Sequence, residues 1–284
     1  IQEIYNMAVN KNSVVNIAGY KFEPLDDAID LIPIYQQKCD ELLLKGTMLI
    51  SKNGINFSIA GTQQATDSFI DFIEEDNRFL DIQLKVTYSE TQPFRRMKVR
   101  LKKEIISLGR KDINPREMTG ERISPEALKN LLDKKEEVLV LDTRNEYETR
   151  VGKFENAIDL NLDTFRDFPE AVESLPEEYK DKQIVMYCTG GIRCEKASAV
   201  MMKAGFEDVK QLDGGVLAQQ GIHYIDLLIY LFGDPKKCIS LISKKVNKLQ
   251  AEDTHTSLIS FKKKGLTCTV NMSTAFRPKD FEAS

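Results

Sequence analysis

The sequence predicts an α/β protein with more than one domain. In the first 108 residues the expected elements follow the order strand, helix, strand, strand, helix, strand. From residue 122 onward, short continuous apolar runs alternate with amphipathic segments, which is typical of a parallel sheet buried between helices. One of these runs ends at a cysteine that is followed by glycines and a further helix. The length of 284 residues is enough for one to three domains, each with its own core.

Composition narrows the classes of function. The net charge of −4 argues against a globally basic nucleic-acid-binding protein, so any RNA contact must come from a local patch. Five cysteines at irregular positions fit a reducing, cytoplasmic location better than a disulfide framework. No signal peptide is evident and no apolar run approaches the ~18 residues of a membrane span, so we expect no membrane association. Two histidines without Cys/His clustering predict no metal site. Because the chain begins at Ile1 and not at Met, we expect a piece of a longer protein.

The first predicted domain covers residues 14–108, and its element order is that of a ferredoxin-like α+β fold. The elements are a strand at 14–22, a helix at 26–44, strands at 46–51 and 55–60, a helix at 64–75 and a strand at 84–89. The spacing places Ile29, Ile32, Tyr35 or Gln36, Cys39 and Leu43 near the inward face of the first helix. Residues 1–13 are polar and unpatterned, and we interpret them as an extension.

A basic strand at residues 95–103 contains the densest positive run of this acidic chain. Met97, Val99 and Leu101 alternate with cations, so strand geometry would turn the apolar side chains inward and the cations outward. The stripe is suited to contact with several phosphates, or it is a solvated edge strand whose charges discourage aggregation. The candidate RNA-binding residues are Arg95, Arg96, Lys98, Arg100, Lys102 and Lys103.

The second predicted domain covers residues 122–217 and follows a linker at 109–121. Ser124 is expected to cap a helix that has Pro125 at its first position. Apolar strands are expected at 138–141, 157–160 and 183–187, with a helix at 165–175 and another at 195–204. The parallel arrangement places the residues that follow each strand at one edge of the sheet, where such folds carry their sites.

The stretch from Cys188 to Cys194 combines a strand end, a glycine loop and a helix start. Backbone N–H groups and the helix dipole favour an anion at such a place, so the thiol of Cys188 is expected to ionise readily. The anion-binding loop comprises Thr189, Gly190, Gly191, Ile192 and Cys194, and Arg193 adds a fixed positive charge. The other interpretation is that Cys188 is a small buried apolar residue at a strand end.

These residues carry a family resemblance. The run CTGGIRCEKAS at 188–198 resembles the active-site loop of rhodanese domains and, more narrowly, of the rhodanese-type tRNA uridine 5-hydroxylases. The run LVLDTRNEY at 139–147 resembles the strand and turn whose Asp and Arg, here Asp142 and Arg144, shape the floor of that active site. Segments of the first domain, such as 45–47, 54–56, 59–61 and 92–94, match the same hydroxylase family, so the resemblance covers residues 14–217.

The resemblance implies an enzyme that uses molecular oxygen as a co-substrate to convert the wobble uridine of certain tRNAs to 5-hydroxyuridine. It implies that Cys188 is required and that tRNA is the partner, while no cofactor is identifiable in the sequence. A sulfurtransferase that carries a Cys188 persulfide is one alternative, and a non-catalytic RNA or protein adaptor is another. No feature predicts the oligomeric state.

Roles within the loop follow from its chemistry. We hypothesise that Cys188 adds to C6 of the uracil and makes C5 nucleophilic. Arg193 is suited to hold a phosphate or oxyanion. Cys194 either resolves an oxidised Cys188 through a disulfide or packs at the helix start. Asp142 and Arg144 form either the active-site floor or a structural ion pair beneath the loop.

Residues 215–284 resemble a different family, the C-terminal part of glucose-fructose oxidoreductase-like dehydrogenases. No G-x-G-x-x-G follows a strand anywhere in the chain, so a dehydrogenase is excluded as the function. We interpret residues 218–284 as a partial α+β segment with a helix at 221–232 that contains His223, and with strands at 238–245, 255–262 and 266–273. Such a segment has an incomplete core, so we expect it to be poorly ordered, or to pack on itself or on a second copy.

Overall fold

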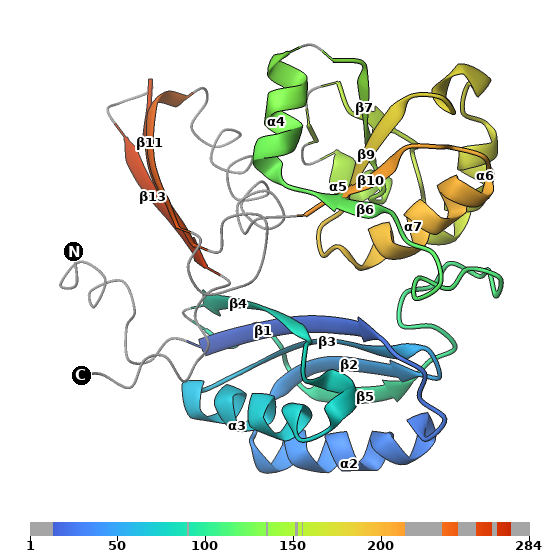
Figure 1. Cartoon of the computed structure of the whole chain (residues 1–284). Helices are drawn as coiled ribbons and strands as arrows, with labels where there is room; N and C mark the ends of the chain where they lie inside the picture. The colour runs from blue at the N-terminus through green and yellow to red at the C-terminus, as the bar shows by residue number, and fades with distance from the viewer. Residues whose placement is uncertain are drawn as a thin grey trace. The chain divides into compact units, whose positions relative to one another are not determined.

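The computed structural model describes residues 14–89, 91–134, 136–150, 153–154, 156–213, 235–243, 254–262 and 266–273. The chain divides after Ile105 into two compact units (Figure 1). The described strands form three separate sheets: one in the first unit, a parallel sheet in the second, and a three-stranded sheet near the C-terminus.

The first unit is a ferredoxin-like domain, as predicted. Its elements are β1 Val14–Phe22, α2 Ala28–Glu41, β2 Lys45–Ser51, β3 Gly54–Gly61, α3 Gln63–Glu74, the 3₁₀ turn η1 Asn77–Phe79, β4 Gln83–Ser89 and β5 Met97–Leu101. The sheet has the order β4-β1-β3-β2-β5. The first four strands are antiparallel, and β5 is added in parallel at the β2 edge. Both long helices cover the same face of this sheet (Figure 1).

The helix face predicted for α2 was partly wrong. Ile29 is 66% exposed and Leu43 is 81% exposed, whereas Ala28 and Leu31 are buried with Cys39. The predicted stripe is therefore wrong only at its two ends, because Cys39 is buried as expected and Ile32 packs against the core. Leu43 leaves the stripe because α2 ends at Glu41, and Leu43 itself has a left-handed backbone with φ of 54°.

The strand β5 has the alternation that the sequence predicted, except at its end. Met97 and Val99 pack against the core of the first unit, so Lys98 and Arg100 point to the opposite side of the sheet. Leu101, which was expected inward, is 49% exposed because it is the last residue of the strand and extends past the core.

The second unit contains a parallel sheet of order β6-β10-β9-β7-β8. Its elements are β6 Glu121–Ile123, α4 Pro125–Asp133, β7 Val138–Asp142, α5 Glu146–Thr149, β8 Ile158–Asp159, η2 Phe165–Asp167, α6 Phe168–Glu173, η3 Glu177–Tyr179, β9 Gln183–Tyr187, α7 Ile192–Lys203 and β10 Val209–Leu212. Alternate side chains of β9 supply two cores: Ile184 and Met186 pack in the core that includes α6 and α7, and Val185 and Tyr187 pack in the core that includes α4. The continuous apolar run at 183–187 is thus explained by burial on both faces.

The segment predicted as a linker packs along α7. Ile113, and Leu108 directly before the predicted linker, are buried in the same core as that helix. The Thr119 hydroxyl donates to the Glu195 carboxylate at 2.8 Å, and the Gly120 N–H donates to the Ser198 hydroxyl at 2.9 Å. Residues 106–120 therefore help to hold α7 in place.

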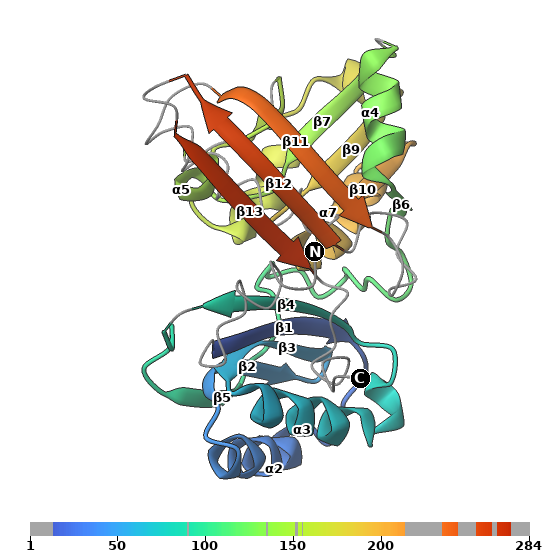
Figure 2. The ribbon, with the colours of Figure 1, turned by 90° about the vertical axis from the view of Figure 1, so that its left-hand side faces the viewer.

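The C-terminal sheet consists of β11 Pro235–Ser243, β12 Thr254–Phe261 and β13 Thr267–Ser273, side by side in that order (Figure 2). The three strands predicted here are confirmed, with β11 and β12 starting slightly earlier than expected. Ile259, Phe261 and Val270 form a small core of their own. The helix predicted at 221–232, with His223, lies outside the described residues. Among the described helices none has the length and apolar character to cross a membrane.

Candidate active site

Cys188 directly follows β9, the middle strand of the parallel sheet, at its carboxyl end. The helix α7 begins at Ile192, three residues earlier than predicted, so the connecting loop is only residues 188–191. Ile192, Arg193 and Cys194 are therefore the first turn of α7. This short connection places the cysteine sulfur against the N-terminus of the helix.

Backbone and side-chain donors converge on the Cys188 sulfur. The Gly191 N–H donates to Sγ at 3.0 Å. The pKa of Cys188 is held well below its usual value by a hydrogen bond from the Cys194 thiol, which outweighs the cost of burial; the positive charge of Arg193 and the N–H groups of Cys194 and Gly190 lower it further. The thiolate predicted from the sequence is thus supported by specific donors.

The two loop glycines serve the site differently. Gly191 has φ of 84°, a left-handed conformation that favours glycine, and it immediately precedes α7. Gly190 has no such backbone requirement, and a Cβ built on it would meet nothing within 4 Å. The space beside Gly190 is therefore open, whereas Cys188 itself is only 4% exposed.

Cys194 lies beneath the loop with a partner that the sequence did not reveal. Its sulfur is 3.6 Å from the Thr143 hydroxyl, and that hydroxyl also bonds to the Tyr187 carbonyl at 2.9 Å. Burial, reinforced by the neighbouring Cys188 sulfur, raises the pKa of Cys194 well above its usual value. The opposite pKa shifts therefore favour a thiolate at Cys188 beside a thiol at Cys194. Across the described residues there is no group of three or more His, Cys, Asp or Glu side chains placed to hold a metal ion.

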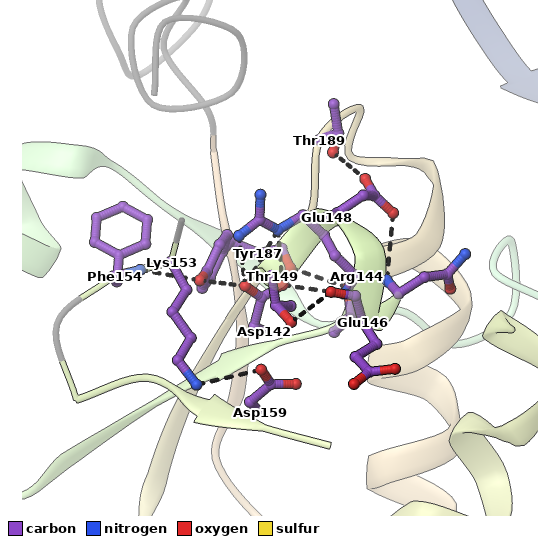
Figure 3. A network of polar contacts seen from close by, with 12 residues as sticks. Asp142, Arg144, Glu146, Glu148, Thr149, Lys153, Phe154, Asp159, Tyr187 and Thr189 are labelled. Carbon is purple, nitrogen blue, oxygen red and sulfur yellow. Dashed lines mark hydrogen bonds and ion pairs between the residues drawn. The ribbon is translucent and has the colours of Figure 1, made fainter. Parts of the chain in front are cut away.

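The Arg193 guanidinium forms a two-pronged ion pair with Glu148, a residue that sequence reasoning missed. Nη1 and Nη2 of Arg193 lie 2.6 and 2.7 Å from Oε2 and Oε1 of Glu148. The Thr189 hydroxyl donates to the same carboxylate at 2.7 Å (Figure 3). Arg193 is thus fixed beside Cys188 by a carboxylate that also ties down the loop.

Glu148 is positioned by the short helix α5. The Asn145 N–H donates to the Glu148 carboxylate at 3.2 Å. Asn145 is the residue just before the helix and Glu148 is its third residue, and such a pair often forms this hydrogen bond. The sequence carries this signal as Asn145-x-x-Glu148, which predicts a helix start there. It gives no hint of the contact with Arg193, because 45 residues separate the partners.

Asp142 and Arg144 form a buried ion pair. Arg144 Nη2 lies 2.7 Å from Asp142 Oδ2, and both side chains are almost fully inaccessible. The Tyr187 hydroxyl donates to the same carboxylate, and the guanidinium carbon of Arg144 lies 5.3 Å from the centre of the Tyr187 ring (Figure 3). The pair thus fixes the residue that precedes Cys188, and its assignment as the floor of the active site stays a prediction.

The predicted RNA-binding residues all belong to the first unit, whereas Cys188 belongs to the second. Arg95, Arg96, Arg100, Lys102 and Lys103 are exposed and Lys98 is half-buried. The positive charges of Arg96 and Arg100 lower the pKa of Lys98.

Comparisons with known proteins agree with this geometry. Residues 14–105 match the UPF0176 acylphosphatase-like domain, and residues 124–220 match the rhodanese-like domain. Fold and site therefore define a two-domain protein whose second domain is rhodanese-like. Proteins named tRNA uridine(34) hydroxylase are similar to it: one from Cupriavidus necator is 45% identical over 72% of this chain and 74% of its own length, and one from Delftia acidovorans is 43% identical over 72% and 80%. This chain belongs to the tRNA uridine(34) hydroxylase family.

The C-terminal resemblance is also confirmed. Residues 193–283 match the GFO/IDH/MocA C-terminal domain. This match begins earlier than the predicted start at residue 215, and it overlaps the rhodanese-like match from residue 193 to residue 220. The overlap includes α7 except its first residue, Ile192, so Arg193 and Cys194 lie within both matches.

Alkylation tests the thiolate. We expect iodoacetamide to label Cys188 faster at pH 6 than an ordinary exposed thiol, because the lowered pKa keeps the sulfur ionised. Replacing Arg193 with Met removes a positive charge that favours the thiolate, so the midpoint of the alkylation profile should move to higher pH. The Lys203→Met variant, at the far end of α7, is the control and should leave the midpoint unchanged. Peptide mass analysis of labelling between pH 5 and 10 measures both, and equal midpoints in all three proteins would contradict the role of Arg193.

The Glu148 ion pair should make stability depend on pH. Burial alone would raise the pKa of Glu148, but Arg193 and Thr189 lower it to about 2 from 4.5. A carboxylate with a lowered folded-state pKa stabilises fully above its unfolded value and loses that contribution as pH falls towards the folded value. Between pH 6 and pH 4 this residue should therefore account for a loss of about 1 kcal/mol of unfolding free energy.

The Glu148→Gln variant should lack this part of the pH dependence. We also expect it to be less stable at pH 7 by about 1–3 kcal/mol, because Arg193 then keeps only neutral partners. Urea denaturation at pH 7, 6 and 4 measures both effects. Glu146→Gln, on the same helix but in a more exposed pair with Arg150, is the control, and identical curves for the two variants would refute the assignment.

Proposed function

We propose that this chain hydroxylates the wobble uridine of tRNA at C5 with molecular oxygen, and that Cys188 is the residue that reacts with the base. The observation that carries the proposal is the sulfur of Cys188, held as a thiolate between the end of β9 and the start of α7. Support also comes from the curated relatives, whose name gives both the reaction and the position of the uridine.

The geometry supplies the nucleophile that this chemistry requires. Addition of the thiolate to C6 of the uracil moves an electron pair towards C5 and the C4 carbonyl, which makes C5 nucleophilic towards an oxidant. The N–H groups that stabilise the free thiolate are also placed to receive it when it is expelled. Arg193, fixed by Glu148, holds a positive charge beside the base as negative charge develops. Oxygen is the co-substrate, and no cofactor is assigned.

The basic stripe of the first unit is proposed as a tRNA contact. Lys98 and Arg100 project from the side of the sheet that α2 and α3 leave uncovered, with Arg96 close to Lys98. The stripe therefore presents several cations at a spacing suited to successive phosphates. A tRNA substrate and five free cysteines also favour the cytoplasm as the location.

Sulfur transfer is the second candidate, since the donors around Cys188 would stabilise a persulfide anion as well as a thiolate. An adaptor without catalysis is the third, but it would have no use for a cysteine held in an ionised state. The hydroxylase relatives match over 72% of this chain, well beyond the rhodanese-like domain at 124–220. This favours hydroxylation, because a sulfurtransferase requires only the rhodanese-like domain.

Nucleoside mass analysis tests the reaction. After incubation of tRNA with the full chain in air, we expect a mass gain of one oxygen atom at the wobble uridine. Cys188→Ser should lose activity by at least about 10³-fold, since it removes the nucleophile. Cys238→Ser, the same substitution at an exposed cysteine on β11, is the matched control and should retain the activity. Unchanged uridine together with a thiosulfate-dependent mass gain of one sulfur atom, lost in Cys188→Ser, would instead establish the sulfurtransferase.

The salt dependence of tRNA binding tests the stripe. We expect the double variant Lys98→Gln, Arg100→Gln to raise the dissociation constant about tenfold and to flatten the log–log salt slope by roughly 1.5–2. The double variant Lys129→Gln, Lys134→Gln removes two exposed cations of α4 and its end, and it should change neither quantity. Fluorescence anisotropy of labelled tRNA between 50 and 200 mM salt provides the measurement. Indistinguishable slopes for the two double variants would assign the stripe to solubility alone.

A further inference from the structure

The reaction with oxygen leaves two electrons to be accounted for. Reduction of dioxygen to one hydroxyl oxygen and one water takes four electrons. The C5–H bond that becomes C5–OH supplies two of them. The other two must come from a reductant, and this inference rests on the proposed hydroxylation.

Two thiol sulfurs lie together where the base must react. Cys188 ends β9 and Cys194 is in the first turn of α7, and the short loop brings their side chains into hydrogen-bond contact. Cys194 is oriented from below by the Thr143 hydroxyl at 3.6 Å. Both cysteines are free and buried. Two thiols in contact are a two-electron reductant, because they form a disulfide.

We propose that Cys188 and Cys194 together are the electron source of the hydroxylation. Each turnover converts the pair to a disulfide, and a thiol or dithiol reductant must restore it before the next one. The net reaction is uridine, dioxygen and two thiols going to 5-hydroxyuridine, water and one disulfide. Oxygen, hydrogen and electrons balance in this form.

The steps follow from the same sulfur. Cys188 adds to C6, and the electron pair displaced to C5 forms a bond to dioxygen, which takes up a proton to give a C5 hydroperoxide. Loss of the C5 proton expels Cys188 from C6 and restores the ring. The freed thiolate then attacks the outer peroxide oxygen, the O–O bond breaks, and the products are C5–OH and a Cys188 sulfenic acid. Cys194 attacks the Cys188 sulfur, and the hydroxyl leaves as water when the S–S bond forms.

Burial makes the neighbouring internal thiol the first partner of an oxidised Cys188. Cys188 is 4% exposed and Cys194 is 2% exposed. A sulfenic acid at Cys188 therefore meets the Cys194 thiol, which is already in contact, before a thiol from solution reaches it. The other cysteines belong to other parts of the fold: Cys39 is in the core of the first unit, and Cys238 and Cys268 are on strands of the C-terminal sheet.

Cys194→Ser separates an electron source from a packing or hydrogen-bonding role. Serine keeps a donor next to Cys188 and nearly the same volume, but it cannot form the disulfide. The alkylation profile of Cys188 should thus change little, while turnover at low reductant should fall at least about tenfold and the Cys188 sulfenic acid should become trappable with dimedone. The matched control is Thr143→Val, which removes the hydroxyl from Cys194 and keeps both thiols. Melting curves check that each variant is folded.

The decisive measurement is stoichiometry. The reduced full chain, freed of added thiol, is mixed with tRNA in air, quenched in acid, alkylated and mapped by peptide mass analysis. We expect one Cys188–Cys194 disulfide for each 5-hydroxyuridine, a halt after one turnover, and resumption when dithiothreitol is added; Thr143→Val should keep this ratio. Without tRNA, limiting peroxide should produce the same disulfide.

Two results would overturn the inference while leaving hydroxylation intact. One is 5-hydroxyuridine formed with both thiols still reduced. The other is Cys194→Ser completing repeated turnovers at the wild-type rate when the added reductant is low. If no condition yields 5-hydroxyuridine, the proposed function fails first, and this inference fails with it.

Discussion

The contact between one sulfur and the N-terminus of one helix is the constraint on which this site depends. A strand that ended one residue later, or a loop one residue longer, would move the sulfur away from the N–H groups that ionise it. The loop of residues 188–191 meets this requirement because Gly191 adopts a left-handed backbone conformation and lets α7 begin at once. The reactivity of Cys188 is therefore a property of backbone geometry first and of neighbouring charges second.

Such geometry is useful only if the helix cannot move, and several buried polar contacts hold α7. The Glu195 carboxylate accepts from Arg122 at 2.7 Å and from Thr119 at 2.8 Å, although it is on a helix that is buried almost all round. The Lys196 ammonium reaches the Ile106 carbonyl at 3.2 Å. Satisfied polar groups of this kind fix one orientation of a helix, where apolar packing alone would allow it to rotate. The charged residues Glu195 and Lys196 thus help to hold Cys194 in position. Their polarity alone would predict an exposed face of the helix.

The sequence predicted the parts of the molecule that depend on local pattern. The element order of the first domain, the strand that delivers Cys188 and the cap at Ser124 follow from periodicity and capping rules, and the structure confirms them. The wrong predictions concern features that local pattern does not encode. Leu43 was assigned inward because the pattern cannot show that the helix has already ended, and the start of α7 was placed late because Ile192 and Arg193 carry no helix-start signal of their own. Glu148 and Thr143 were missed because their roles arise from contacts across 45 and 51 residues.

The second thiol also bears on which sulfur chemistry this site can sustain. A sulfur carrier must keep a persulfide on its cysteine until the acceptor arrives. Here a thiol at Cys194 is in hydrogen-bond contact with the carrying sulfur, and its attack on a Cys188 persulfide would form the Cys188–Cys194 disulfide and release hydrosulfide. The Cys194 thiol would thus remove the sulfur from a persulfide carrier, and the same thiol would complete a reduction of oxygen. The pairing of a thiolate and a thiol at the start of α7 therefore favours an oxidative reaction over group transfer, on grounds that are independent of the family to which the chain belongs.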